Sequence, residues 1–103
     1  MSSSTPGTST ARTEGGSARV RYWAAARAAA GVDSDTVDVG SGTTLAAVLK
    51  EVRALHADRP RLDDVVAICS VLVGDRPVGA TDPEDVRIAP GDTVELLPPF
   101  AGG

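Results

Sequence analysis

Residues 45–55 read Leu-Ala-Ala-Val-Leu-Lys-Glu-Val-Arg-Ala-Leu, and this stretch decides the fold. Its aliphatic residues recur at i, i+3, i+4, i+7 and i+10, which places them along one face of an α-helix. They are Leu45, Val48, Leu49, Val52 and Leu55. Thr43 or Thr44 supplies the N-cap, and the helix ends before Pro60. Burial of these side chains, at about 1.5–3 kcal/mol each, makes the helix the main cover of the core.

Two strands are expected before this helix, joined by a shorter helix. Residues 19–23 and 36–39 alternate in polarity, which is typical of half-buried strands. Between them, residues 24–30 are alanine except for one arginine, and alanine is the best helix former. Gly31 follows where a left-handed C-cap is needed.

After the long helix, residues 61–66 are interpreted as a polar connection with at most one helical turn, and residues 68–73 as a strand. Gly74 and Asp75 predict a two-residue type II′ hairpin, since glycine comes first in that turn. The return strand contains Pro77, which cannot donate a ladder hydrogen bond, so we expect a short strand at a sheet edge.

The last segments lead directly into a C-terminal strand. Residues 81–85 predict a capped single turn with proline at its first helical position, and residues 89–92 predict a second turn. Residues 93–97 form the last strand, which can lie parallel to the first in the sheet centre. The expected fold is α+β: a ubiquitin-like β-grasp with a mixed sheet and one long amphipathic helix, which leaves one sheet face free for a partner.

Composition limits the class of protein. The 103 residues suit one domain, placed at residues 18–103, and the Ser-, Thr- and Gly-rich residues 1–17 predict a disordered extension. Aromatic residues make up only 3%, so the core must be aliphatic. A net charge of −4 argues against a nucleic-acid partner. With no membrane-spanning run, no secretory signal and one cysteine, we expect a cytoplasmic protein.

Residues 98–103 predict a stiff, extended segment that ends in two residues without side chains. Pro98 and Pro99 restrict the backbone and favour an extended path away from the last strand. Gly102 and Gly103 have no side chain, so they can enter a slot that any other residue would block. We expect Gly103 to be the C-terminus and its α-carboxylate to be the functional group.

Three segments together carry a resemblance to a known family. Residues 21–27, Arg-Tyr-Trp-Ala-Ala-Ala-Arg, are followed by Gly31; residues 71–78 form the expected hairpin; and residues 89–103 end in Leu-Leu-Pro-Pro-Phe-Ala-Gly-Gly. They resemble the MoaD/ThiS family of sulfur carriers, most closely the small subunit of molybdopterin synthase. Two departures are Gly-Asp in the hairpin, where Asn-Gly is usual, and Phe100, where a smaller aliphatic residue is common.

The resemblance implies a sulfur carrier. An E1-like adenylyltransferase of the MoeB type would use ATP to adenylate the carboxylate of Gly103. Sulfur from a cysteine desulfurase or rhodanese would then give a thiocarboxylate. The large subunit of molybdopterin synthase, of the MoaE type, would take up the tail within a heterotetramer and build the dithiolene of molybdopterin. The chain itself would bind no cofactor or metal and contribute no catalytic side chain, so enzymatic activity would belong to the complex.

Further residues are candidates for contact with these partners. The residues expected to enter a partner are Pro98, Pro99, Phe100, Ala101 and Gly102. Phe100 is interpreted as an aromatic anchor, and Trp23 and Leu97 as a partner surface, although Trp23 could instead cap the core. Cys69 is interpreted as a small hydrophobic residue in a strand, and His56 as a capping or solvated residue at a helix end.

Three alternatives stay open. The chain could carry sulfur for thiamine or cysteine biosynthesis, although the short helix at residues 24–30 favours the molybdopterin branch. It could be a ubiquitin-like modifier joined to lysines through Gly103. It could also be a β-grasp binding module whose tail is inert.

Overall fold

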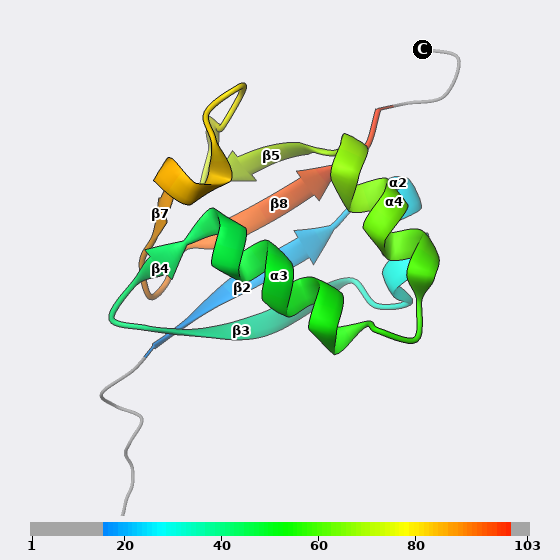
Figure 1. The fold of residues 1–103 in the computed structure, drawn as a ribbon, viewed down its shortest axis with the longest axis horizontal. Helices are drawn as coiled ribbons and strands as arrows, with labels where there is room; N and C mark the ends of the chain where they lie inside the picture. Colours follow the sequence, from blue (N-terminus) through cyan, green and yellow to red (C-terminus); the bar gives the residue numbers. More distant parts are fainter. Residues whose placement is uncertain (1–15, 100–103) are drawn as a thin grey trace, which may run out of the picture.

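A five-stranded mixed sheet frames the protein, and the computed structural model describes residues 16–99 (Figure 1). The elements are β2 (Gly16–Tyr22), α2 (Ala24–Ala30), β3 (Ser34–Gly40), β4 (Thr43–Thr44), α3 (Leu45–Leu55), α4 (Pro60–Ile68), β5 (Ser70–Val73), β6 (Arg76–Pro77), the 3-10 helix η1 (Pro83–Asp85), β7 (Arg87–Ile88) and β8 (Thr93–Leu97). The large sheet has the order β3-β2-β8-β5-β6, and β4 pairs with β7 in a second, two-stranded sheet.

The last strand, β8, occupies the centre of the large sheet. It runs parallel to β2, with Val20 opposite Val94 and Tyr22 opposite Leu96. On its other side it runs antiparallel to β5. The prediction that the first and last strands lie parallel in the sheet centre is therefore confirmed, and the fold is the expected β-grasp.

The helix α3 covers one face of the sheet, and its aliphatic stripe forms much of the core. Leu45, Val48, Leu49 and Val52 are at most 8% exposed, and Thr44 caps the helix by accepting a hydrogen bond from the N–H of Ala47 at 3.1 Å. They meet the inward side chains of the central strands, which are Val20, Tyr22, Val94 and Leu96. The core is thus aliphatic, as composition required.

The prediction that Leu55 belongs to the buried stripe of the helix is wrong. Its side chain is 48% exposed at the end of α3. At 3.6 residues per turn it lies about 80° around the helix from Leu45, so the stripe has rotated away from the sheet by that point.

A second covering helix, α4, replaces the predicted polar connection. It begins with Pro60 at its first position, and Leu62 and Val66 are buried one turn apart. Ile68 ends this helix with 63% exposure instead of starting a strand, and β5 begins only at Ser70. The expectation of one long helix was therefore incomplete, because two buried positions among polar and β-branched residues give a weak helical pattern.

The first strand begins at Gly16, three residues before the expected strand and two before the expected start of the domain. Gly16 is paired with Gly40, and the carbonyl of Ser17 accepts a hydrogen bond from the N–H of Gly91 at 2.8 Å. A Cβ at position 16 would lie 2.4 Å from Cβ of Pro90. These contacts order residues 16 and 17, whereas residues 1–15 lie outside the described part of the chain.

The predicted caps and turns are confirmed in detail. Gly31 ends α2 with φ of 82°, and its N–H bonds to the carbonyl of Arg27. Gly74 has φ of 65° in the two-residue loop between β5 and β6, as a type II′ turn requires. The edge strand β6 contains Pro77, and Asp82 caps η1.

Candidate functional site at the root of the tail

The tail leaves from the end of β8, in the middle of the sheet. Leu97 is partly buried, Pro98 is buried and Pro99 is exposed. The first proline therefore belongs to the body of the domain, and Pro99 alone is exposed among the tail residues that the structure describes. Phe100, Ala101, Gly102 and Gly103 lie outside the described residues.

Beside this root, Trp23 is held in a defined orientation. Its backbone N–H bonds to the carbonyl of Leu96 at 3.2 Å, and its indole Nε1–H donates to Oε1 of Glu95 at 2.9 Å. The guanidinium carbon of Arg21 lies 4.8 Å from the indole centroid, a cation–π contact. Trp23 therefore does not cap the core: it is 40% exposed beside the tail.

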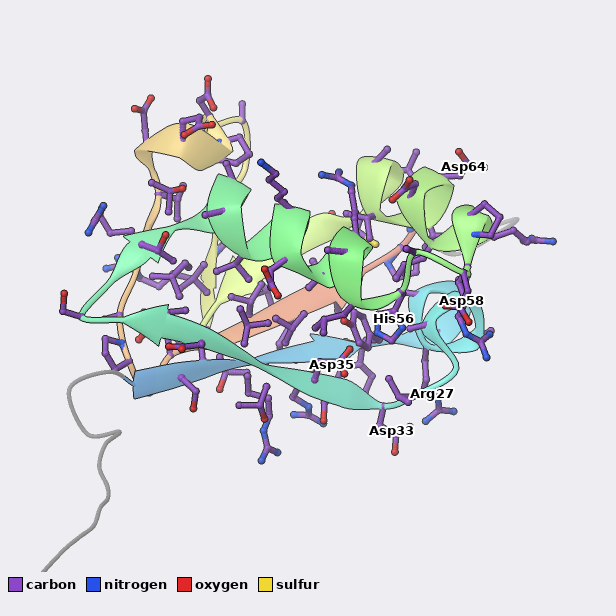
Figure 2. The ribbon with its side chains drawn as sticks, turned by 60° about the horizontal axis from the view of Figure 1, so that its bottom comes forward. Arg27, Asp33, Asp35, His56, Asp58 and Asp64 are labelled. Atoms are coloured by element: carbon purple, nitrogen blue, oxygen red, sulfur yellow. The ribbon has the colours of Figure 1, made fainter. Side chains whose placement is uncertain are left out.

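The sheet surface opposite α3 and α4 is hereafter called the open face; Figure 2 shows both helices on the other side of the sheet. Strand register places Arg21, Leu72 and Glu95 together on it, because Glu95 is opposite both of the others. Leu97 alternates with buried Leu96 and so lies on this face too. The open face therefore carries both apolar side chains and charged side chains of both signs.

On the helix side, a polar cluster ties the end of α3 to the sheet. Oδ2 of Asp35 accepts the hydroxyl of Tyr22 at 2.7 Å and lies 2.5 Å from Nε2 of His56. The two rings make an edge contact with centroids 5.9 Å apart. His56 is the C-cap residue of α3, which agrees with the first of the two expected roles, and its side chain is not solvated but only 12% exposed.

We expect Tyr22 to resist ionisation in the folded protein. Burial, and secondarily the hydrogen bond and charge of Asp35, raise the pKa of Tyr22 well above its ordinary value. The unfolded chain loses this proton near pH 10 and the folded chain keeps it, so stability is unaffected below that pH and falls above it. Alkaline ultraviolet titration checks this directly, because the chain has one tyrosine.

Asp35→Asn is the control for this titration. It removes the charge and keeps an acceptor, and the pKa of Tyr22 should stay raised because burial is the larger cause. A folded protein whose phenol titrates near pH 10 would contradict this account.

Cys69 is not in a strand but caps the C-terminal end of α4, where it is half-buried. Burial raises the pKa of its thiol to about 11. The reactive thiolate is therefore scarce at neutral pH, which argues for packing and against sulfur transfer through this residue.

We therefore expect Cys69 to be alkylated about ten- to a hundredfold more slowly in the folded protein than in urea, because the folded thiolate fraction is smaller. Iodoacetamide labelling at pH 8, followed by mass spectrometry, measures both rates. Equal rates in the two states would show that the thiol is not protected.

Sequence patterns located the start of the tail but not the side-chain contacts beside it. The structure brings Trp23 and Leu97 to the same face and adds Arg21 and Glu95, which contact the indole ring of Trp23. Their role as a partner surface stays a prediction. Within residues 16–99, no group of three or more His, Cys, Asp or Glu side chains could hold a metal ion, and each helix is too short or too polar to cross a membrane.

Comparison with known proteins agrees with this geometry. The molybdopterin synthase sulfur carrier subunit of Chlamydomonas reinhardtii is 33% identical over 85 residues, covering 82% of this chain and 96% of that protein. The crystal structure of SAMP1 from Haloferax volcanii matches with a TM-score of 0.67 and 26% identity, covering 85% of this chain and all of that one (100%).

A complex of subunits 1 and 2 of molybdopterin-converting factor from Helicobacter pylori matches with a TM-score of 0.55. Its identity of 22%, over 84% of this chain and 99% of the matched chain, shows a shared fold. The model of the ThiS family matches residues 20–103, which is most of the sequence and includes the tail. The chain therefore belongs to the ThiS family.

Proposed function

We propose that this chain carries sulfur on the α-carboxylate of Gly103 and delivers it for molybdopterin formation. The observation that carries the proposal is the family match, which runs through residue 103 and so includes the tail that leaves from β8. The homologue in Chlamydomonas reinhardtii is named as a sulfur carrier subunit of molybdopterin synthase, and the match covers 96% of it.

The proposed chemistry uses the carboxylate and needs no side chain of this protein. A terminal carboxylate is ionised at neutral pH and is a poor electrophile. In the proposed reaction it attacks the α-phosphate of ATP on an E1-like enzyme of the MoeB type, forming an acyl-adenylate and pyrophosphate. The terminal sulfur of a persulfide on a cysteine desulfurase or rhodanese then displaces AMP and forms an acyl disulfide. A second thiol of the donor system cleaves the S–S bond, which releases the thiocarboxylate and leaves a disulfide on the donor. The single cysteine, Cys69, fits a reducing compartment such as the cytoplasm.

We propose that the open face and the tail together bind a large subunit of the MoaE type, in a heterotetramer. Trp23 is 40% exposed beside the tail and is held rigidly by Glu95 and Arg21, so little entropy is lost when it is buried by a partner. The Helicobacter pylori structure, named as a complex of subunits 1 and 2 of a converting factor, supports a two-subunit assembly.

Replacing this aromatic residue should weaken the complex. We expect Trp23→Ala to reduce affinity for the large subunit at least about fivefold, since buried aromatic residues dominate interfaces. Arg76→Ala, on the exposed edge strand β6, is the control and should bind normally. Calorimetric titration measures both, and an unchanged affinity for Trp23→Ala would exclude Trp23 from the interface.

The pathway is tested by giving the thiocarboxylated chain to a candidate large subunit together with the cyclic pyranopterin precursor. The proposal predicts sulfur transfer and formation of the dithiolene. Transfer into thiazole or cysteine, with no dithiolene, would assign the chain to thiamine or cysteine biosynthesis.

A second candidate function is protein modification. It is favoured by the similarity to SAMP1, the small archaeal modifier protein 1 of Haloferax volcanii. In that case Gly103 would become linked to lysine side chains of other proteins. Branched peptides that carry Gly-Gly on lysine, found in digests of the source cells and lost when Gly103 is removed, would establish it.

A further inference from the structure

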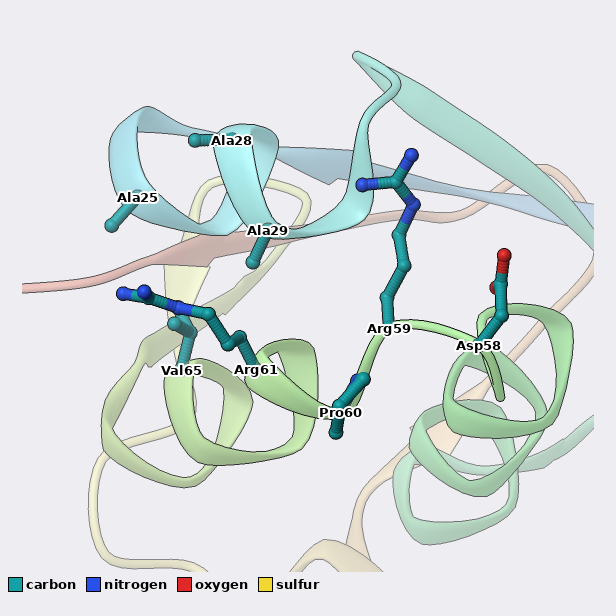
Figure 3. A pocket seen from close by; sticks show the side chains of 8 residues that line it. All are labelled: Ala25, Ala28, Ala29, Asp58, Arg59, Pro60, Arg61 and Val65. Carbon is teal, nitrogen blue, oxygen red and sulfur yellow. The ribbon is translucent and has the colours of Figure 1, made fainter.

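A groove of about 620 Å³ runs between α2 and α4. Figure 3 shows its two walls, with Ala25 and Ala29 pointing from α2 toward α4, and Arg61 and Val65 rising from α4. Ala28 and Arg59 also line it. None of these residues lies on a strand of the sheet.

The α2 wall of the groove is made of small side chains. Ala25 and Ala28 are exposed and Ala29 is partly buried, whereas Ala26 and Ala30 are buried against the core. An alanine surface lets another backbone approach closely, and it gives apolar contact without a long side chain in the way. The half-buried Val65 continues this apolar strip on α4.

Two arginines flank the strip. Arg59 reaches the C-terminal end of α2, where its guanidinium carbon would lie 2.7 Å from a Cβ built on Gly31, and Arg61 reaches toward Ala25 (Figure 3). Within residues 16–99, neither arginine has a carboxylate within 4.0 Å, in contrast to Arg27 and Arg53, which pair with aspartates at 3.5 and 3.4 Å.

One carboxylate, that of Asp58, also lines the groove, next to Arg59. Asp58 therefore offsets part of the positive charge at the Arg59 end and leaves Arg61 as the stronger anion site. Two arginines and one aspartate line the groove, so it is positively charged although the net charge of the whole chain is −4.

We propose that this groove binds an acidic helical segment of a partner protein. The strip of alanine and valine accepts the apolar side of a helix, and Arg59 and Arg61 accept carboxylates at two separated points. A single inorganic anion would contact only one end and would leave the apolar strip uncovered. Charge complementarity of this kind fixes the register of a partner and excludes basic competitors.

The test uses the full chain, labelled with ¹⁵N, and a synthetic helical peptide of repeated Ala-Ala-Ala-Glu. A peptide with Gln in place of Glu is the matched neutral control. We expect amide shifts confined to α2 and the first turns of α4 with the Glu peptide, weaker at high salt, and no comparable shifts with the Gln peptide. Absent shifts, shifts elsewhere on the protein, or equal binding of both peptides would overturn the proposal.

Two charge-matched variants locate the contact. Arg61→Glu should weaken binding of the Glu peptide about fivefold or more, whereas Arg76→Glu, on the distant β6, should change it less than about twofold. The spectra themselves report that each variant is folded. If inorganic phosphate reproduces both the shifts and the affinity of the peptide, the groove is a small-anion site and the proposal is wrong.

Discussion

Removal of Gly103 will abolish thiocarboxylate formation and leave the domain folded. The reacting carbon is proposed to be the carboxyl carbon of this residue, and a chain that ends at Gly102 presents its carboxylate one residue short of the activating site. The buried core cluster of the described residues runs from Ala18 to Leu96. We therefore expect a complete loss of sulfur incorporation, measured by intact mass, with an unchanged urea unfolding curve.

The matched control is a chain shortened by one residue at its other end, through removal of Ser2. It should accept sulfur as the full chain does. If the chain without Gly103 still gains sulfur, the reactive group is elsewhere, and Cys69 becomes the first residue to examine. If the unfolding curve of the chain without Gly103 shifts, the tail contributes to the fold. Loss of sulfur incorporation could then not be assigned to the carboxylate.

Truncation of Leu45 will destabilise the domain by about 2–5 kcal/mol, the usual cost of replacing a buried leucine with alanine. Leu45 is 0% exposed and lies where α3 meets the core, close to β7 and η1 through the hydrogen bond from its N–H to the carbonyl of Val86. The substitution Leu45→Ala keeps that backbone bond and removes only packing. Urea denaturation with a constant slope measures the effect.

The same helix offers the control, Leu55→Ala. This leucine ends α3 with its side chain 48% exposed, so we expect a change of less than about 1 kcal/mol. The sequence pattern alone treats the two leucines as equivalent, and the structure does not. Equal losses at the two positions would show that α3 packs with a different rotation from the one described.

The sequence was sufficient for the elements whose signals are local. Gly31, Gly74 and Pro77 each have a backbone property that only one position of a cap, turn or edge strand requires, and each was placed correctly. The parallel pairing of β2 with β8 followed from the crossover between them. Such features depend on neighbouring residues or on topology, so a single sequence contains them.

Features that depend on distant packing were missed. Leu62 and Val66 are the buried positions of α4, which packs against the rest of the core. Their burial depends on this packing, and no local sequence pattern indicates it. Gly16 in β2 pairs with Gly40, and Pro90, far along the chain, leaves no room for a side chain at position 16.

The candidate site likewise contains some features that the sequence predicts and others that depend on contacts between distant residues. Gly102 and Gly103 were assigned from the tail sequence, and their roles stay predictions because they lie outside the described residues. The support of Trp23 by Glu95, 72 positions away, could not be foreseen, nor could the pairing of His56 with Asp35. The groove between α2 and α4 is also invisible in the sequence, since its two walls come from separate segments.

The most direct test of sulfur transfer is the intact mass of the chain after incubation with ATP, sulfide and an E1-like enzyme from the same source. The account predicts a gain that corresponds to the exchange of one oxygen for one sulfur, located at Gly103 by fragmentation and absent when ATP is omitted. An unchanged mass with an enzyme shown to be active on its own known carrier, or a gain located at Cys69, would contradict it.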